Sequence, residues 1–160
     1  MASKVESSRS KAISILMPED NLHEIKIPLR ALIVDDNRIE RMMHTVLLRR
    51  FQVETTEAEN GKDAVDHLVE GKTFDIILMD KDMPVMDGPE ATRILRAMGF
   101  RAKIVGITAD DSAEGKKAFM EAGLDEFLIK PLTLTKLTPL IQDLVPKVDS
   151  KNNVCDSKLE

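Results

Sequence analysis

The stretch Phe74-Asp75-Ile76-Ile77-Leu78-Met79-Asp80-Lys81-Asp82-Met83-Pro84 decides the fold. An apolar run of strand length ends in the carboxylate of Asp80, and Pro84 stops the strand from continuing. A strand that is apolar on both faces is typical of the centre of a parallel sheet with helices on each side. Because such sheets bind ligands beyond the carboxyl ends of their strands, we expect Asp80 at the rim of a crevice.

The length of 160 residues allows one folded domain of roughly 100–150 residues with additional tails. We expect this domain over residues 29–145 and flexible tails over residues 1–28 and 146–160, which are polar and mixed in charge. No apolar run approaches the ~18 residues of a membrane helix, so we expect no membrane association. The single cysteine, Cys155, provides no disulfide framework, which suits a reducing compartment. These features favour the cytoplasm, with the nucleus as a second location.

The distribution of charge argues against nucleic-acid binding. Basic and acidic residues balance in both terminal segments, so the net charge of −5 belongs to residues 29–145. A folded part with an acidic balance is repelled by the phosphate backbone of DNA. The sequence therefore predicts no nonspecific binding to nucleic acid.

Strand-like and helix-like segments alternate along residues 29–145. Five such alternations predict an α/β fold with parallel strands, right-handed crossovers and helices on both faces. One strand alternates more loosely than the others and belongs at an edge, which favours a flavodoxin-like, doubly wound five-stranded sheet in the order 2-1-3-4-5. The strands are predicted at 29–34, 52–58, 74–80, 102–107 and 126–129, and the helices near 38–50, 61–71, 88–99, 112–123 and 134–144.

Local signals mark where the helices begin and end. Asp36 or Asn37 is the natural N-cap of the first helix, and Asp87 is the natural N-cap of the third. In the last helical segment, Pro139 cannot donate a backbone hydrogen bond. Either that helix is kinked at Pro139, or its regular part begins at Thr138.

Polar side chains follow four of the predicted strands. Asp35 and Asp36 come after the first strand, Asp80 ends the third, Thr108 follows the fourth and Lys130 follows the fifth. In the order 2-1-3-4-5 the first and third strands are neighbours, so the three carboxylates are expected to converge. Two carboxylates ~4 Å apart repel each other by roughly 4 kcal/mol at an effective dielectric constant of about 20. A cation or shifted pKa values must relieve this repulsion, and oxygen ligands without cysteine or histidine favour Mg²⁺.

An alternative interpretation gives each of these polar residues a purely structural role. In it, the Asp35-Asp36 pair is only a helix cap and Asp80 only terminates a strand, since aspartate is common at both places. Thr108 would then reflect strand propensity and Lys130 an exposed cation before a proline. The combination of all five residue types at one rim argues against this interpretation.

Several motifs, taken together at this spacing, resemble the receiver domains of two-component response regulators. The resemblance covers roughly residues 30–145. The motifs are Leu32-Ile33-Val34-Asp35-Asp36-Asn37, Leu78-Met79-Asp80-Lys81-Asp82-Met83-Pro84, Met86-Asp87-Gly88, Ile107-Thr108-Ala109 and Lys130-Pro131.

The resemblance implies a role for each rim residue. Asp80 would accept a phosphoryl group from a phosphohistidine, and Asp36 and Asp80 would bind Mg²⁺ with help from Asp35. The backbone carbonyl of Asp82 would be a further metal ligand. A cis peptide bond at Lys130-Pro131 would aim the lysine amine at the phosphoryl oxygens. Such in-line transfer needs a nucleophile, a metal and further donors, so the chemistry is consistent with these residue types.

Receivers usually couple a hydroxyl residue to an aromatic residue on the fifth strand. By resemblance, Thr108 donates its hydroxyl group to the phosphoryl group, and Phe127 is the aromatic residue that moves with it. Phe127 is equally consistent with plain core packing. Family members often carry tyrosine there, and the missing hydroxyl leaves open how the switched state is recognised.

The amino-acid sequences of these motifs resemble those in the receivers of hybrid histidine kinases and in the plant receiver-only regulators called type C. By resemblance, the chain is a stand-alone, monomeric receiver in a multistep His-to-Asp phosphorelay. A histidine phosphotransfer protein, supplied by a hybrid histidine kinase, would dock near the first helix at Ile39, Met42 and Met43, although some of these must serve the core. The receiver could act as a phosphate sink by losing its acyl phosphate to water. On the same helix, His44 is expected to be solvated.

Three rival interpretations stay open. Asp80-Lys81-Asp82 matches the Asp-x-Asp start of haloacid-dehalogenase-type phosphatases, but Met83 departs from that pattern and the Asp35-Asp36 pair has no place in it. A receiver that only docks partners would gain nothing from clustered acids. The chain could also be the detached receiver of a larger hybrid kinase.

Overall fold

The computed structural model describes residues 28–145, which form one parallel sheet in the order β2-β1-β3-β4-β5. The predicted fold and strand order are therefore confirmed, whereas the predicted tails lie, apart from Pro28, outside the described residues. The strands are β1 (Arg30–Val34), β2 (Glu54–Ala58), β3 (Ile76–Asp80), β4 (Lys103–Thr108) and β5 (Glu126–Ile129). The helices are α2 (Arg38–Arg49), α3 (Gly61–Val69), α4 (Gly88–Ala97), α5 (Ala113–Glu121) and α6 (Leu134–Leu144).

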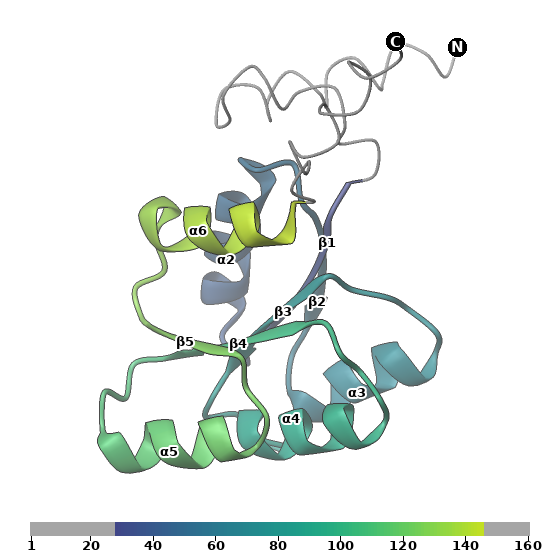
Figure 1. The fold of residues 1–160 in the computed structure, drawn as a ribbon, viewed down its shortest axis with the longest axis vertical. Coiled ribbons are helices and arrows are strands. Elements are labelled where there is room, and N and C mark those ends of the chain that lie inside the picture. Colours follow the sequence, from purple (N-terminus) through teal and green to yellow (C-terminus); the bar gives the residue numbers. More distant parts are fainter. Residues whose placement is uncertain (1–27, 146–160) are drawn as a thin grey trace, which may run out of the picture.

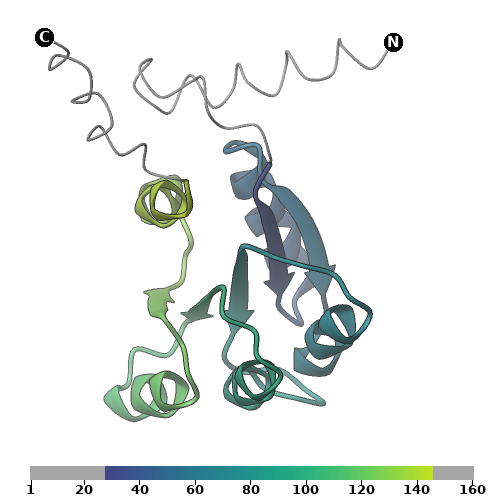
Figure 2. The ribbon, with the colours of Figure 1, turned by 45° about the vertical axis from the view of Figure 1, so that its right-hand side comes forward.

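The helices form two layers, one on each face of the sheet. Helices α2 and α6 cover one face, and α3, α4 and α5 cover the other (Figures 1 and 2). Each layer encloses its own apolar cluster. In β3, Ile76 and Leu78 pack into the cluster under α2 and α6, while Ile77 and Met79 pack into the opposite one. All five residues of β3 are buried, as expected of a central strand.

Side-chain caps start α2 and α4 where the sequence predicts. The side chain of Asn37 accepts hydrogen bonds at the start of α2, and that of Asp87 accepts one from the backbone of Glu90 at the start of α4. Helix α6 begins at Leu134, so a start at Thr138 is wrong, and Pro139 lies inside the helix. Each cap satisfies backbone N–H groups that have no partner within the helix.

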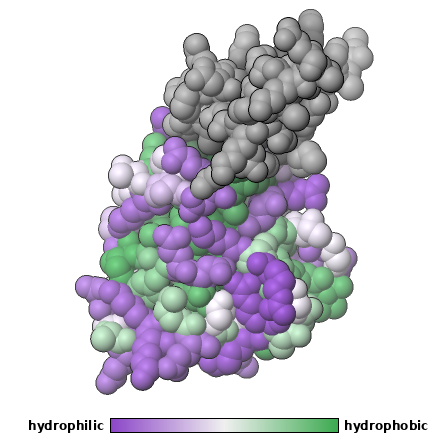
Figure 3. Space-filling view, in the orientation of Figure 1, coloured by the Kyte–Doolittle hydropathy of each residue, from purple (hydrophilic) through white to green (hydrophobic). Residues whose placement is uncertain are grey.

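The surface of the domain is mixed in polarity. The face in view in Figure 3 intersperses hydrophilic and hydrophobic residues, as is usual for a folded domain. Among residues 28–145, no helix combines the length and the apolar character that crossing a membrane requires.

Gly88 allows α4 to pack directly against the end of β3. A Cβ atom at this position would lie 2.2 Å from the backbone oxygen of Asp80 and 2.9 Å from the ring of Phe119. The backbone N–H of Gly88 also donates a 2.9 Å hydrogen bond to the oxygen of Lys81. The absence of a side chain at Gly88 therefore allows the start of α4 to lie against the backbone of Asp80.

We predict that Gly88→Ala lowers the free energy of unfolding by about 2–4 kcal/mol, because the backbone at Asp80 must shift to admit the methyl group. Gly71→Ala is the matched control, since a Cβ atom there meets nothing and only the positive φ of +90° opposes it. Urea denaturation measures both. A loss at Gly88 no larger than the loss at Gly71 would show that this contact relaxes easily.

Candidate functional site

The three predicted acidic residues converge at the carboxyl ends of β1 and β3. These strands are direct neighbours, with Val34 opposite Met79, so the residues that follow them share one edge of the sheet. Asp35, Asp36 and Asp80 each offer a carboxylate oxygen, and these oxygens all lie within 4.8 Å of one another. Asp35 and Asp80 are buried, and Asp36 is exposed. The predicted convergence is confirmed.

Lys130 reaches the acidic cluster from the end of β5. Its ammonium group lies 3.1 Å from Asp35 Oδ2 and 3.3 Å from Asp80 Oδ1, and it also contacts the carboxylate of Glu40. The peptide bond between Lys130 and Pro131 is cis, as predicted. The only cation in direct contact with Asp80 within residues 28–145 is therefore the predicted lysine.

Burial makes the charges of this cluster unfavourable. Burial and the neighbouring Asp35 carboxylate raise the pKa of Asp80 to about 7, against the opposing effect of Lys130. Burial also raises the pKa of Asp35, although the backbone N–H of Asn37 donates to its carboxylate. Burial would lower the pKa of Lys130, but its three carboxylate neighbours together raise it above the ordinary value. The cluster thus holds more negative charge than its one ammonium group offsets.

Thr108 lies beside this cluster, at the end of β4. Ile107, the preceding residue, is paired with Asp80 in the sheet. The Thr108 hydroxyl oxygen accepts a 3.0 Å hydrogen bond from the backbone N–H of Asp110. Its own O–H group can therefore donate to another oxygen. The carboxylate of Asp110 in turn pairs with Lys81, 2.7 Å away, which lowers the pKa of Asp110.

Phe127 is half-buried and joins the apolar cluster under α3, α4 and α5. Its ring packs edge-on against Phe119 with a centroid distance of 6.3 Å, and the Lys116 ammonium lies 5.6 Å from its centroid. This position is consistent with both the switch role and plain packing, so the switch role stays a prediction.

Helix α2 is oriented differently from what its sequence suggests. Ile39, Met42 and Met43 are all more than half exposed, so the expectation that some of them serve the core is wrong. His44 is buried, so its predicted solvation is also wrong. The inward face consists of Arg41, His44, Thr45 and Leu48.

The reason for this orientation is an arginine that supports the acidic loop. The guanidinium group of Arg41 donates a 2.7 Å hydrogen bond to the backbone oxygen of Asp35 and lies 3.4 Å from Glu57. A buried charge is tolerated when it is paired in this way. Arg41 and Glu40 were not predicted, although their place one turn into a helix that starts at an acidic pair was a usable signal.

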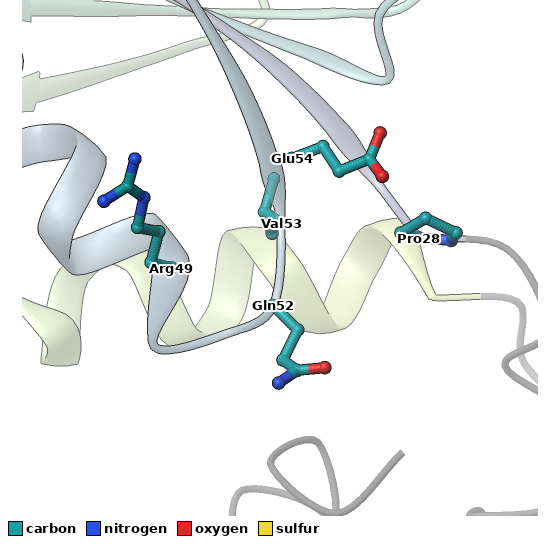
Figure 4. A pocket seen from close by; sticks show the side chains of 5 residues that line it. All are labelled: Pro28, Arg49, Gln52, Val53 and Glu54. Atoms are coloured by element: carbon teal, nitrogen blue, oxygen red, sulfur yellow. The ribbon is translucent and has the colours of Figure 1, made fainter. Parts of the chain in front are cut away.

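A pocket of about 190 Å³ lies at the opposite end of the sheet from the acidic cluster. It opens between the end of α2 and the starts of β1 and β2, where Arg30 is paired with Glu54 (Figure 4). Its lining residues are Pro28, Arg49, Gln52, Val53 and Glu54. None of the predicted site residues belongs to it.

The acidic cluster suits a hard divalent cation. All of its ligand atoms are carboxylate oxygens, and Mg²⁺ prefers such oxygens and keeps waters in its remaining positions. The exposed carboxylate of Asp36 leaves the site open to solvent on one side. The residues present therefore fit Mg²⁺.

Known proteins are similar to this chain in sequence and in fold. The family model of the response regulator receiver domain matches residues 31–142. Two-component response regulator 24 of Arabidopsis thaliana is 46% identical over 124 residues, which cover 78% of this chain and 88% of that protein. Two-component response regulator ARR22 of the same plant is 42% identical over 147 residues, covering 90% of this chain and 98% of that protein.

A solved structure extends the comparison to the metal. The receiver domain of sensor histidine kinase PA1611 from Pseudomonas aeruginosa has a TM-score of 0.67 and 31% identity, over 74% of this chain and 98% of that one. That structure contains a magnesium ion coordinated in its active-site cleft. With the matching family model, fold and acidic cluster, this chain belongs to the response regulator receiver domain family and is a receiver of the plant type in two-component signalling.

Proposed function

We propose that Asp80 accepts a phosphoryl group from the phosphohistidine of a histidine phosphotransfer protein, in a Mg²⁺-dependent step of a His-to-Asp phosphorelay. The observation that carries this proposal is the gathering of three carboxylates within 4.8 Å, beside the ammonium group of Lys130. A purely docking surface gains nothing from such repulsion, whereas phosphoryl transfer needs both the nucleophile and the metal ligands.

Asp80 is the nucleophile. Its Oδ1 accepts a 3.0 Å hydrogen bond from the backbone N–H of Lys81 and lies 3.3 Å from Lys130. Within residues 28–145 both contacts fall on Oδ1, which leaves Oδ2 for attack on phosphorus. The new Oδ2–P bond replaces the P–N bond of the phosphohistidine, whose electron pair returns to the imidazole ring.

The other rim residues act on the charge of the transferred group. Lys130 and the hydroxyl group of Thr108 would bind phosphoryl oxygens. Asp36 and Asp80, with help from Asp35 and the backbone carbonyl of Asp82, would hold Mg²⁺. The bound ion would supply positive charge that keeps Asp80 ionised and neutralises the phosphoryl oxygens.

The exposed side of α2 is the proposed docking surface for the phosphotransfer protein. Ile39, Met42, Met43 and Val46 are 68%, 54%, 55% and 58% exposed, and we call these four residues the α2 face. Their spacing places them on one side of the helix. A contiguous apolar surface of this kind marks an interaction site and fits an apolar helical partner.

We further propose that this receiver acts as a monomeric phosphate sink that loses its acyl phosphate to water. The exposed carboxylate of Asp36, which leaves one side of the site open to water, supports this proposal. The upstream source of the phosphoryl group would be a hybrid histidine kinase. The cytoplasm, or the nucleus, stays our prediction for its location.

We predict that Asp80→Asn abolishes transfer of labelled phosphate from a phosphorylated histidine phosphotransfer protein, because the amide is not a nucleophile. Circular dichroism should show an unchanged fold. Asp143→Asn is the matched control, since that exposed carboxylate lies on α6 and pairs with Lys103, and it should transfer normally. Transfer that survives in Asp80→Asn would remove this residue from its role, and normal transfer in excess EDTA would remove the metal.

We predict that Met43→Glu slows transfer from the phosphotransfer protein about tenfold or more, because a charge in the α2 face opposes docking. Phosphorylation by acetyl phosphate, which needs no docking, should not change. Val69→Glu places the same charge at an exposed apolar position on α3 and serves as the control. An equal slowing with both phosphate donors would place the defect in the site and not in docking.

We predict that Asp80→Asn stabilises the metal-free protein at pH 7.5 and has much less effect at pH 4. The raised pKa of about 7 means that folding favours the protonated carboxyl group. The destabilising contribution of Asp80 therefore develops as pH rises above the ordinary value of 3.8 and is complete above pH 7, reaching up to about 4 kcal/mol. Urea denaturation in EDTA at the two pH values measures the difference. A gain of equal size at both would refute the electrostatic cause.

A further inference from the structure

Glu40 brings a fourth carboxylate to the site, from the first turn of α2. It contacts the ammonium group of Lys130, and its Oε2 atom is shielded from solvent. Glu40 is absent from the set of oxygens that could share one metal ion. Its place in the site is therefore that of a partner for Lys130.

With Glu40, the site carries more negative charge than a divalent cation and Lys130 would balance. Asp35, Asp36 and Asp80 carry three formal negative charges, which a divalent cation and the one ammonium group of Lys130 balance. Glu40 adds a fourth negative charge, which repels an incoming phosphoryl group and competes for the ammonium group. While Glu40 holds the ammonium group of Lys130, that group is not free to bind a phosphoryl oxygen.

The three carboxylates that contact Lys130 differ in their freedom to move. The side chain of Asp35 is 2% exposed and is anchored by the backbone N–H of Asn37. The side chain of Asp80 is 10% exposed and would itself become the acyl phosphate. The longer side chain of Glu40 is 33% exposed and can turn outward into water. Glu40 is thus the one of the three that can release the ammonium group.

We propose that Glu40 is a positioning residue that holds the ammonium group of Lys130 in the unphosphorylated site and releases it to the phosphoryl group that arrives on Asp80. The release step rests on the proposed function of Asp80. The resting contact between Glu40 and Lys130 does not, so the two can be tested separately.

The first test measures the resting contact without any phosphorylation. Urea midpoints are compared for the metal-free protein, Glu40→Gln, Lys130→Met and the double variant, with circular dichroism to confirm folding. If the two side chains hold each other, the shifts of the two single variants do not add up in the double variant. Additive shifts would overturn the proposal.

The second test measures the release. Acetyl phosphate phosphorylates Asp80 by forming an O–P bond as the P–O bond to acetate breaks and acetate leaves with the electron pair. Glu40→Gln removes the charge at constant shape, and Glu40→Asp keeps the charge but shortens the side chain. Because both loosen the hold on Lys130, both should be phosphorylated about two- to fivefold faster.

The control is Glu59→Gln, which removes an exposed charge near the same rim that pairs with Arg41 and not with Lys130. It should leave the rate unchanged. Unchanged or slower phosphorylation of Glu40→Gln would overturn the proposal, as would a wild-type rate in Glu40→Asp, which would show a general effect of charge. If the wild-type protein itself takes no label, the proposed function of Asp80 fails, and the urea experiment still decides the resting contact.

Discussion

Repulsion among buried carboxylates is the constraint on which the rest of this structure depends. Asp35 and Asp80 are both buried at the edge of the sheet, and the carboxylate of Asp35 raises the cost of ionising Asp80. Two apolar layers hold the strands that carry them, so the carboxylates cannot move apart without disturbing the core. The packing of the domain thus maintains a site that is unfavourable in the absence of a cation.

The sheet order converts this constraint into a binding site. Because β1 and β3 are neighbours, an acidic loop that follows one strand meets the acid that ends the other. Lys130 then arrives from β5, at the far edge of the sheet, and its long side chain reaches both acids. Arg41 holds the backbone of the acidic loop from the other side. Cations therefore support the acids without covering the exposed Asp36.

The sequence was sufficient to predict the features that repeat along the chain and insufficient for those that depend on one helix. The buried run before Asp80 and the alternation of strands and helices lead to the sheet order, and the order brings the rim residues together. The orientation of α2 was not predictable in this way, since the four apolar residues of the α2 face point outward while Arg41 and His44 join Leu48 on the inward face. Hydrophobic spacing identifies the inner face only where the core takes apolar side chains, and here an ion-paired arginine occupies that place.

Gly115 allows a close contact that connects Thr108 in the site to the start of α5. A Cβ atom at this position in the first turn of α5 would lie 2.5 Å from Asp110 Oδ2 and 2.7 Å from Lys81 Nζ, so the absence of a side chain makes room for this ion pair. Asp110 holds Thr108 through its backbone and Lys81 through its carboxylate. A displacement of Thr108 would therefore also move the ion pair between Asp110 and Lys81. This ion pair connects two loops and lies against the start of α5. The start of that helix is mechanically linked to the hydroxyl group two strands away from β1.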